Sequence, residues 1–220
     1  MKLRYVLIPC AVITLILAAI GISQKASYTD ITGNGSYLST IEVGEIPEEL
    51  AEQECSNMRS VLPQQPIILR VTPVETVEQI FCASRQKVRV EQVFSGDDIE
   101  VNDEIYLTSS SWALSLDETH LSMQRGFVNI LDTEKTYLVF IKGKILDDSV
   151  PVYELYDDGY ITPAFCYDTI ENVIAIPSDE TTFVPYCEVQ NNEFFALSEK
   201  ALNAMVSLKE QMITLFPSNV

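Results

Sequence analysis

Few side chains in this 220-residue sequence are of a type that performs chemistry. His120 is the only histidine, which excludes a metal site built from several imidazoles and leaves a single imidazole base. A cysteine–histidine pair between His120 and Cys82, Cys166 or Cys187 can be written down, but no local motif supports it. We therefore expect no catalytic residue and no enzyme activity, and we interpret His120 as a solvated loop residue.

Two other kinds of polar run have chemical potential. The triplet 109–111 is all serine, and it forms a polar loop unless a base and an oxyanion site lie beside it. Three pairs of consecutive aspartates fall at expected strand ends, and none has the alternate spacing of a calcium-binding loop. They would bind calcium only if two pairs converged, so we expect solvated turns, no metal and no cofactor. The pairs are Asp97-Asp98, Asp147-Asp148 and Asp157-Asp158.

Cysteines are the remaining reactive group. Cys10 lies in the apolar N-terminal run and is interpreted as a small apolar residue. The other four are Cys55, Cys82, Cys166 and Cys187, an even number that permits three disulfide connectivities in an exported domain. One candidate disulfide joins Cys166 to Cys187, because both residues fall in the terminal β region.

The N-terminal segment indicates where the chain is located. Residues 5–22 form an apolar run without a charge, preceded by Lys2 and Arg4. A membrane-spanning helix needs about 20 apolar residues, whereas the core of a signal peptide has about 7–15. We therefore favour a retained single-pass anchor, with residues 1–4 forming a cytoplasmic tip and the C-terminal domain outside the cell membrane.

A cleaved signal peptide is the alternative. Gly21 and Ser23 are small residues placed before Gln24, as a cleavage site requires, and in that case the domain is secreted. In both cases the polar residues 23–46 are expected to form a spacer ahead of the folded part.

Composition limits the partners. The sequence contains 32 acidic and 14 basic residues, a formal charge of −18, and 47% of its residues are hydrophobic. This apolar content is sufficient for a packed core. The acidic surface repels phosphate backbones, so nucleic acid is excluded as a partner. The expected partners are the membrane, through residues 5–22, and a protein outside the cytoplasm.

Apolar periodicity predicts a mainly β domain over residues 63–220. Residues alternate around Ile67–Val71 and Gln86–Phe94, and a turn then leads into Ile105–Leu107. Thr136–Ile141 is apolar on both faces, which is typical of a central strand. Val93 is out of step with Val88 and Val90, which indicates a bulge or late coverage of both faces. Trp112–Leu116 is taken as part of a serine-rich loop. Further short strands are expected at Val152–Tyr156, Tyr160–Tyr167, Val173–Ile176 and Phe183–Val189.

Two helices are expected around the strands. The first lies at Pro47–Arg59, within a lead-in segment 47–62, because Pro occupies a first-turn position and acidic residues follow it. The second occupies residues 198–216, begins at Ser198 as N-cap, and has apolar residues at helical spacing. We expect this stripe to pack against the β domain.

The run VRVEQVFSGDDIEVNDEIYL, followed by TYLVFIKGK, resembles bacterial extracytoplasmic domains distantly related to the tissue inhibitors of metalloproteinases and to netrin modules. The resemblance covers about Ile67 to Lys144. It implies a five-stranded OB-like barrel, here with extra β hairpins, a C-terminal packing helix and an N-terminal transmembrane helix. The matching positions are Val88, Val90, Val93, Phe94, Gly96, Val101, Asp103, Ile105 and Tyr137 to Phe140.

The sequence departs from that family at the inhibitory site. The inhibitors chelate the zinc of their target through a free N-terminal cysteine in a Cys-x-Cys pair. No Cys-x-Cys pair occurs here, and Cys55, the nearest equivalent, lies in mid-chain. We therefore expect a membrane-anchored binding or structural module. The alternative is a regulator or inhibitor of an extracytoplasmic protease that acts through a barrel edge.

Overall fold

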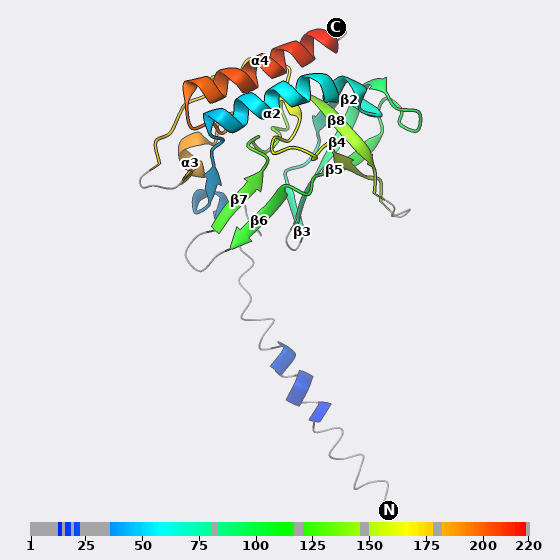
Figure 1. Cartoon of the computed structure of the whole chain (residues 1–220). Helices are drawn as coiled ribbons and strands as arrows, with labels where there is room; N and C mark the ends of the chain where they lie inside the picture. The colour runs from blue at the N-terminus through cyan, green and yellow to red at the C-terminus, as the bar shows by residue number, and fades with distance from the viewer. Residues whose placement is uncertain are drawn as a thin grey trace, which may run out of the picture. The chain divides into compact units, whose positions relative to one another are not determined.

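The structure is a computed structural model, and it describes residues 13–14, 16–18, 20–22, 36–80, 83–116, 121–145, 150–177 and 182–218 (Figure 1). The chain divides into two units, Met1–Tyr37 and the compact unit Leu38–Val220. Most of the predicted anchor at residues 5–22 lies outside the described residues. Among those that are described, no helix has the length and apolar character needed to cross a membrane.

A closed barrel of five strands forms the centre of the compact unit. Its strands are β2 (Ile67–Pro73), β4 (Ala83–Ser95), β5 (Glu104–Thr108), β8 (Tyr137–Lys144) and β9 (Val152–Leu155). They pair in the order β2-β4-β5-β9-β8, and β8 also pairs with β2, which closes the barrel. Among the five barrel strands, β5 and β9 form the one parallel pair. The predicted five-stranded barrel is confirmed, and its strand order is the one expected for an OB-type barrel.

The barrel interior follows the predicted apolar pattern. Val88 and Val90 are fully buried, and the first five residues of β8 are buried as well, as expected for a strand covered on both faces. The register between β2 and β4 shifts at Ile68/Leu69 and again at Arg70/Val71. These shifts are the predicted bulge, and they explain why Val93 falls out of step with the earlier valines.

A second, smaller sheet lies beside the barrel. It has the order β11-β1-β7-β6, with β11 at Phe183–Pro185, β1 at Glu42–Gly44, β7 at Leu121–Arg125 and β6 at Trp112–Leu116. Two short strands extend the barrel sheet: β3 (Glu78–Ile80) pairs with β4, and β10 (Ala164–Cys166) pairs with β8.

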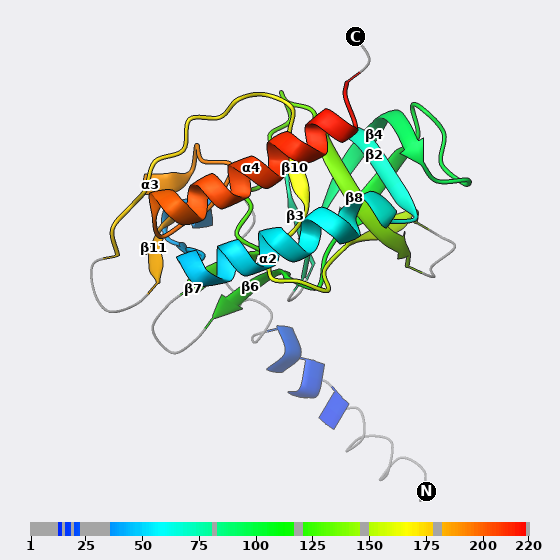
Figure 2. The same ribbon diagram turned by 45° about the horizontal axis from the view of Figure 1, so that its top comes forward.

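Two long helices run side by side along one face of the unit, as Figures 1 and 2 show. They are α2 (Glu48–Val61) and α4 (Glu199–Leu215), and both predicted helices are therefore confirmed. The Ser198 side chain accepts a hydrogen bond from the backbone N–H of Ala201, as the N-cap prediction requires. The short helices are η1 (Ser36–Ser39), η2 (Leu62–Gln64) and α3 (Tyr186–Val189).

The folded unit begins earlier than the sequence indicated. Residues 38–46, assigned to the spacer, contain β1, and the lead-in segment 47–62 is packed helix rather than a separate piece. Ile41, Val43 and Ile46 are fully buried. The apolar residues alternate with polar ones over too few positions to predict a strand from the sequence. The segment is a strand because it pairs with β7 and β11.

Four strand assignments were wrong in whole or in part. The predicted strand Tyr160–Tyr167 is a strand only over β10, Ala164–Cys166. Trp112–Leu116 is a strand rather than a loop, because it pairs along its length with β7. Val173–Ile176 is irregular, and both end residues are exposed. Phe183–Val189 is a strand only as far as Pro185, after which α3 begins. Pro185 lacks an N–H to donate to the ladder, and it is the N-cap residue of α3.

Candidate functional site

The residues that the sequence singled out for chemistry are not brought together. His120, Cys82 and the pair 147–148 lie outside the described residues. The Ser109 and Ser111 hydroxyls bond to each other at 2.8 Å. Residues 97–98 form an exposed bend. In the parts of the chain that are described, no group of three or more His, Cys, Asp or Glu side chains could hold a metal ion.

The third aspartate pair makes ion pairs instead of a metal site. Lys142 Nζ lies 3.2 Å from Asp157 Oδ1 and 3.1 Å from Asp158 Oδ1. Asp157 also accepts a hydrogen bond from the backbone N–H of Ser110 at 3.3 Å. These contacts use the carboxylates to fix a turn beside the end of β5. The Asp157 side chain is 6% exposed, so it is not the solvated turn residue that the sequence predicted.

The described cysteines are not bridged. Cys166 is buried and Cys187 is exposed, and both are free thiols, so the candidate disulfide between them is not formed. Burial raises the pKa of the Cys55 and Cys166 thiols to about 11. A thiol with such a pKa is protonated at neutral pH and is a poor nucleophile.

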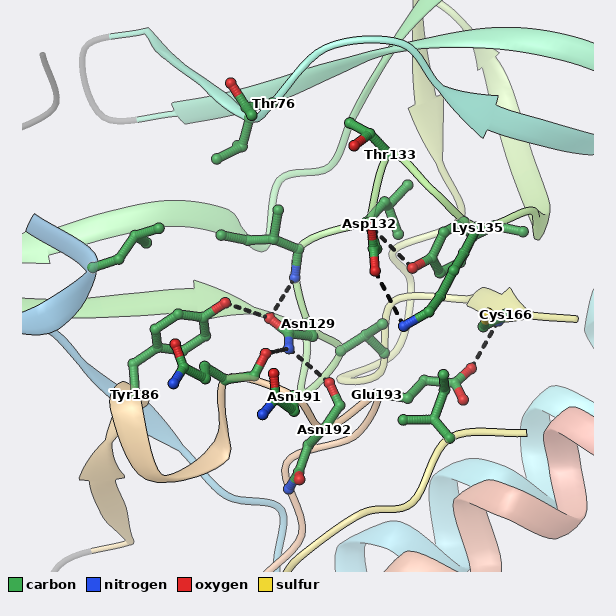
Figure 3. A pocket seen from close by; sticks show the side chains of 18 residues that line it. Thr76, Asn129, Asp132, Thr133, Lys135, Cys166, Tyr186, Asn191, Asn192 and Glu193 are labelled. Atoms are coloured by element: carbon green, nitrogen blue, oxygen red, sulfur yellow. Dashed lines mark hydrogen bonds and ion pairs between the residues drawn. The ribbon is translucent and has the colours of Figure 1, made fainter. Parts of the chain in front are cut away.

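The candidate site is a groove of about 340 Å³, called here the Asn129 groove (Figure 3). Thr76 and Thr133 lie on one side of it, Asn191 and Asn192 on the other, and Asn129 between them. The segments that form it are the turn after β2, residues 128–135 and residues 186–193. Its apolar lining consists of Leu38, Val77, Val128, Ile130, Leu131 and Ile170.

Asn129 joins the two sides of the groove. Its Nδ2 donates to the carbonyl oxygens of Gln190 at 2.9 Å and Asn192 at 2.6 Å. Its Oδ1 accepts from the N–H of Ile130 at 2.7 Å and from the hydroxyl of Tyr186 at 2.9 Å. Both donors and both acceptor positions of the amide are therefore used. Asn129 builds the groove and is not available to a ligand.

An ion pair lies at the rim. Lys135 Nζ is 3.1 Å from Asp132 Oδ2, and Asp132 Oδ1 accepts from the N–H of Glu134 at 3.0 Å. The hydrogen bond from Glu134 is the largest factor that lowers the pKa of Asp132, and the bond to Asp132 raises the pKa of Lys135. The pair contributes opposite charges, so the rim is close to neutral.

A second ion pair is buried where the groove meets α4. Lys209 donates to Glu193 Oε2, and also to the carbonyl oxygen of Asp168 at 2.8 Å. Glu193 Oε1 accepts from the N–H of Cys166 at 2.7 Å. Burial raises the pKa of Glu193, and Lys209 opposes this effect. The pair ties the helix to β10 and to the groove wall.

Four exposed side chains remain available to a ligand. Gln190 and Asn191 offer carboxamides, and Thr76 and Thr133 offer hydroxyls. None of these four side chains makes a hydrogen bond to another described residue. They surround an apolar lining, which is the usual composition of a binding site with a few orienting polar groups.

A second hollow of about 380 Å³ lies beside β7 and includes Phe127, Tyr160 and Phe183. Its buried cation, Arg125, lies 3.6 Å from the centroid of the Trp112 ring. Arg125 therefore contributes to the packing of the β6–β7 hairpin.

Sequence reasoning did not select the residues of the Asn129 groove. Asparagines in irregular segments look like ordinary turn residues, and Asn129 lies about sixty residues from the backbone groups it binds. The burial of Lys209, in contrast, could have been predicted from the sequence. This residue lies four residues after the buried Met205 on the apolar face of a predicted helix, and a buried lysine requires a partner.

The sequence matches no family model and no curated protein.

Proposed function

We propose that this chain is a binding module without catalytic activity, and that the Asn129 groove recognises an extended segment of another protein. The observation that supports this most directly is the set of exposed carboxamides and hydroxyls above an apolar lining. A carboxamide offers a donor and an acceptor together, which matches the alternating N–H and C=O groups of a peptide. Apolar side chains of the segment would occupy the lining.

The composition of the groove disfavours the other ligand classes of OB-type barrels, oligosaccharides and oligonucleotides. Tyr137 and Tyr186 are 5% and 7% exposed, so neither presents a ring face for a sugar or a base to stack on. The formal charge of −18 repels polyanions.

The location is part of the proposal. The apolar run at residues 5–22, with Lys2 and Arg4 before it, supports a single-pass anchor with its N-terminus in the cytoplasm. The compact unit would then meet its partner at the outer surface of the membrane, or as a secreted protein if the leader is cleaved.

The alternative, regulation or inhibition of an extracytoplasmic protease, has one favourable observation. The closed barrel with an OB-type strand order agrees with the fold that the family resemblance implies. The two functions differ in outcome: an inhibitor slows a protease, whereas a binding module captures a segment without affecting its turnover.

A peptide selection on the purified full chain tests the proposal. A displayed library is enriched on the wild type and, in parallel, on a variant carrying Asn191→Ala and Thr133→Val. Asn57→Ala, an exposed asparagine on α2, is the matched control. We expect a shared peptide sequence on the wild type and the control, and its loss on the groove variant. Equal enrichment on all three proteins, or none on any, would contradict the proposal.

A further inference from the structure

An irregular segment at residues 170–177, called here the strap, is attached to the wall of the Asn129 groove by two asparagines. The Asn192 side chain makes two hydrogen bonds to the backbone of Val173. Its Oδ1 accepts from the N–H of Val173 at 2.9 Å, and its Nδ2 donates to the Val173 carbonyl at 2.6 Å. Asn172 Oδ1 accepts from the N–H groups of Glu193 at 2.8 Å and Phe194 at 3.0 Å. The strap and the groove wall therefore form one hydrogen-bonded unit.

Glu45 is the residue directly after β1, and it lies beside the backbone of Ala175 in the strap. It is 1% exposed, and neither carboxylate oxygen has a hydrogen-bond partner among the described residues. Burial raises the pKa of Glu45 to about 7, and the backbone N–H of Ala175 in the strap opposes this rise without reaching hydrogen-bond geometry. A buried carboxyl without partners is tolerated when neutral and is costly when ionised.

No charged side chain compensates for this burial in the part of the chain that is described. Among the described residues, burial and the Ala175 amide are the two influences on the pKa of Glu45. Arg125 is stacked on Trp112 and Glu193 is paired with Lys209, and neither makes a hydrogen bond to Glu45. Asp179 and Glu180 lie outside the described residues. The charged residues on the surrounding elements are Glu42 on β1, Arg125 on β7, Asp157 after β9, Glu171 on the strap, Glu188 on α3 and Glu193 in the groove wall.

We propose that Glu45 is a pH-sensitive latch beneath the strap: with a neutral carboxyl the strap is closed, and ionisation of that carboxyl drives the strap open. Opening exposes the carboxylate to water and breaks the contacts of Asn172 and Asn192. Asn192 and Ile170 line the Asn129 groove, so opening removes part of its wall. The consequence for binding, weaker affinity for the segment as the pH rises, rests on the proposed function.

The direction and range of the effect follow from proton linkage. The closed strap holds the proton up to about pH 7, whereas a hydrated carboxyl releases it near the ordinary value of 4.5. Between these values the closed state binds more protons, so the opening equilibrium rises by up to about tenfold for each pH unit and levels off above about pH 7. A change of sign, with tighter closure at higher pH, is incompatible with the latch.

Hydrogen exchange on the ligand-free full chain tests the latch. The reporting amides are those of Val173, Glu193 and Phe194, and their protection factors are compared at pH 5 and pH 7.5 after correction for the intrinsic rates. We expect the wild-type protection to fall by about tenfold or more across this range. In Glu45→Gln, which cannot ionise, the protection should stay constant within about twofold.

Two controls keep the result interpretable. Glu188→Gln removes an exposed carboxylate on α3 and should retain the wild-type pH dependence. Circular dichroism shows whether Glu45→Gln folds, and if it does not, the wild-type profile alone is decisive. A wild-type protection that is constant between pH 5 and pH 7.5, or an equal fall in Glu45→Gln, would overturn the latch.

The exchange measurement requires no ligand, so it separates this inference from the proposed function. A pH-dependent strap without peptide enrichment retains the latch and removes the binding module. Peptide enrichment with a pH-independent strap retains the binding module and removes the latch.

Discussion

Lys209 on α4 is ion-paired with Glu193 in the wall of the Asn129 groove, and the two side chains are 9% and 3% exposed. The C-terminal helix is thus connected to the site by a buried charge as well as by its apolar stripe. A buried pair contributes little net stability compared with apolar residues, but breaking it is costly because one charge is left without a partner.

Replacing Lys209 with methionine should therefore destabilise the protein by about 3 kcal/mol or more. The loss should be larger at pH 8 than at pH 5, because the unpaired Glu193 is tolerated when protonated. Urea unfolding at both pH values measures the change. Lys200→Met, which removes an exposed lysine paired with Glu48 on α2, should cost at most about 1 kcal/mol. An equal loss in the two variants would show that the buried pair has no special role.

Asn129→Ala should destabilise the protein by about 2–3 kcal/mol, because it leaves four groups without their partner inside the groove. Asn191→Ala removes an exposed side chain of the same groove and should change the free energy of unfolding by less than about 0.5 kcal/mol. Denaturant unfolding of both variants measures the difference. Similar stabilities would mean that Asn129 does not join the two sides of the groove.

Glu45 predicts a pH dependence of global stability. Its pKa of about 7 in the folded state lies above the ordinary value of 4.5, so the folded state binds more protons between these values. The free energy of unfolding should fall as the pH rises from about 5 to 7.5, with up to about 3 kcal/mol of that fall due to this group. Urea unfolding across this range should show a smaller fall for Glu45→Gln. Identical slopes in the two proteins would contradict the burial of an unpaired carboxyl.

The cysteines should differ in reactivity. Cys187 is exposed and free, so alkylation of the native, unreduced protein should modify it. Cys55 and Cys166 are buried and have raised pKa values, so they should react only after unfolding. Mass spectrometry with and without a denaturant measures both classes. A native protein in which Cys166 and Cys187 react only after a reductant is added would restore the disulfide interpretation.

The barrel was predictable from the sequence because its signal is local. The buried positions of β4 and β8 alternate or run continuously within each strand, and Ser198 marks the start of α4 within one turn of the helix. Such patterns depend on neighbours along the chain. They can therefore be recognised in the sequence independently of the remainder of the fold.

The second sheet and the site were not predictable, because their signals are distant in sequence. β1 is a strand only through its pairing with β7 and β11, which lie about eighty and one hundred and forty residues away. Asn129 and Asn192 have the residue type of ordinary turns, and only the fold shows that their amides bind backbone groups. Glu45 looked like one more surface carboxylate in an acidic chain.

The central claim is that the Asn129 groove binds a protein segment, and an NMR titration of the full chain with the peptide enriched in the selection tests it most directly. The account predicts that the largest shift changes occur at Thr76, Thr133, Gln190 and Asn191, and that Asn191→Ala with Thr133→Val weakens the affinity at least tenfold. Shift changes confined to α2, or an affinity that the double substitution leaves unchanged, would contradict it.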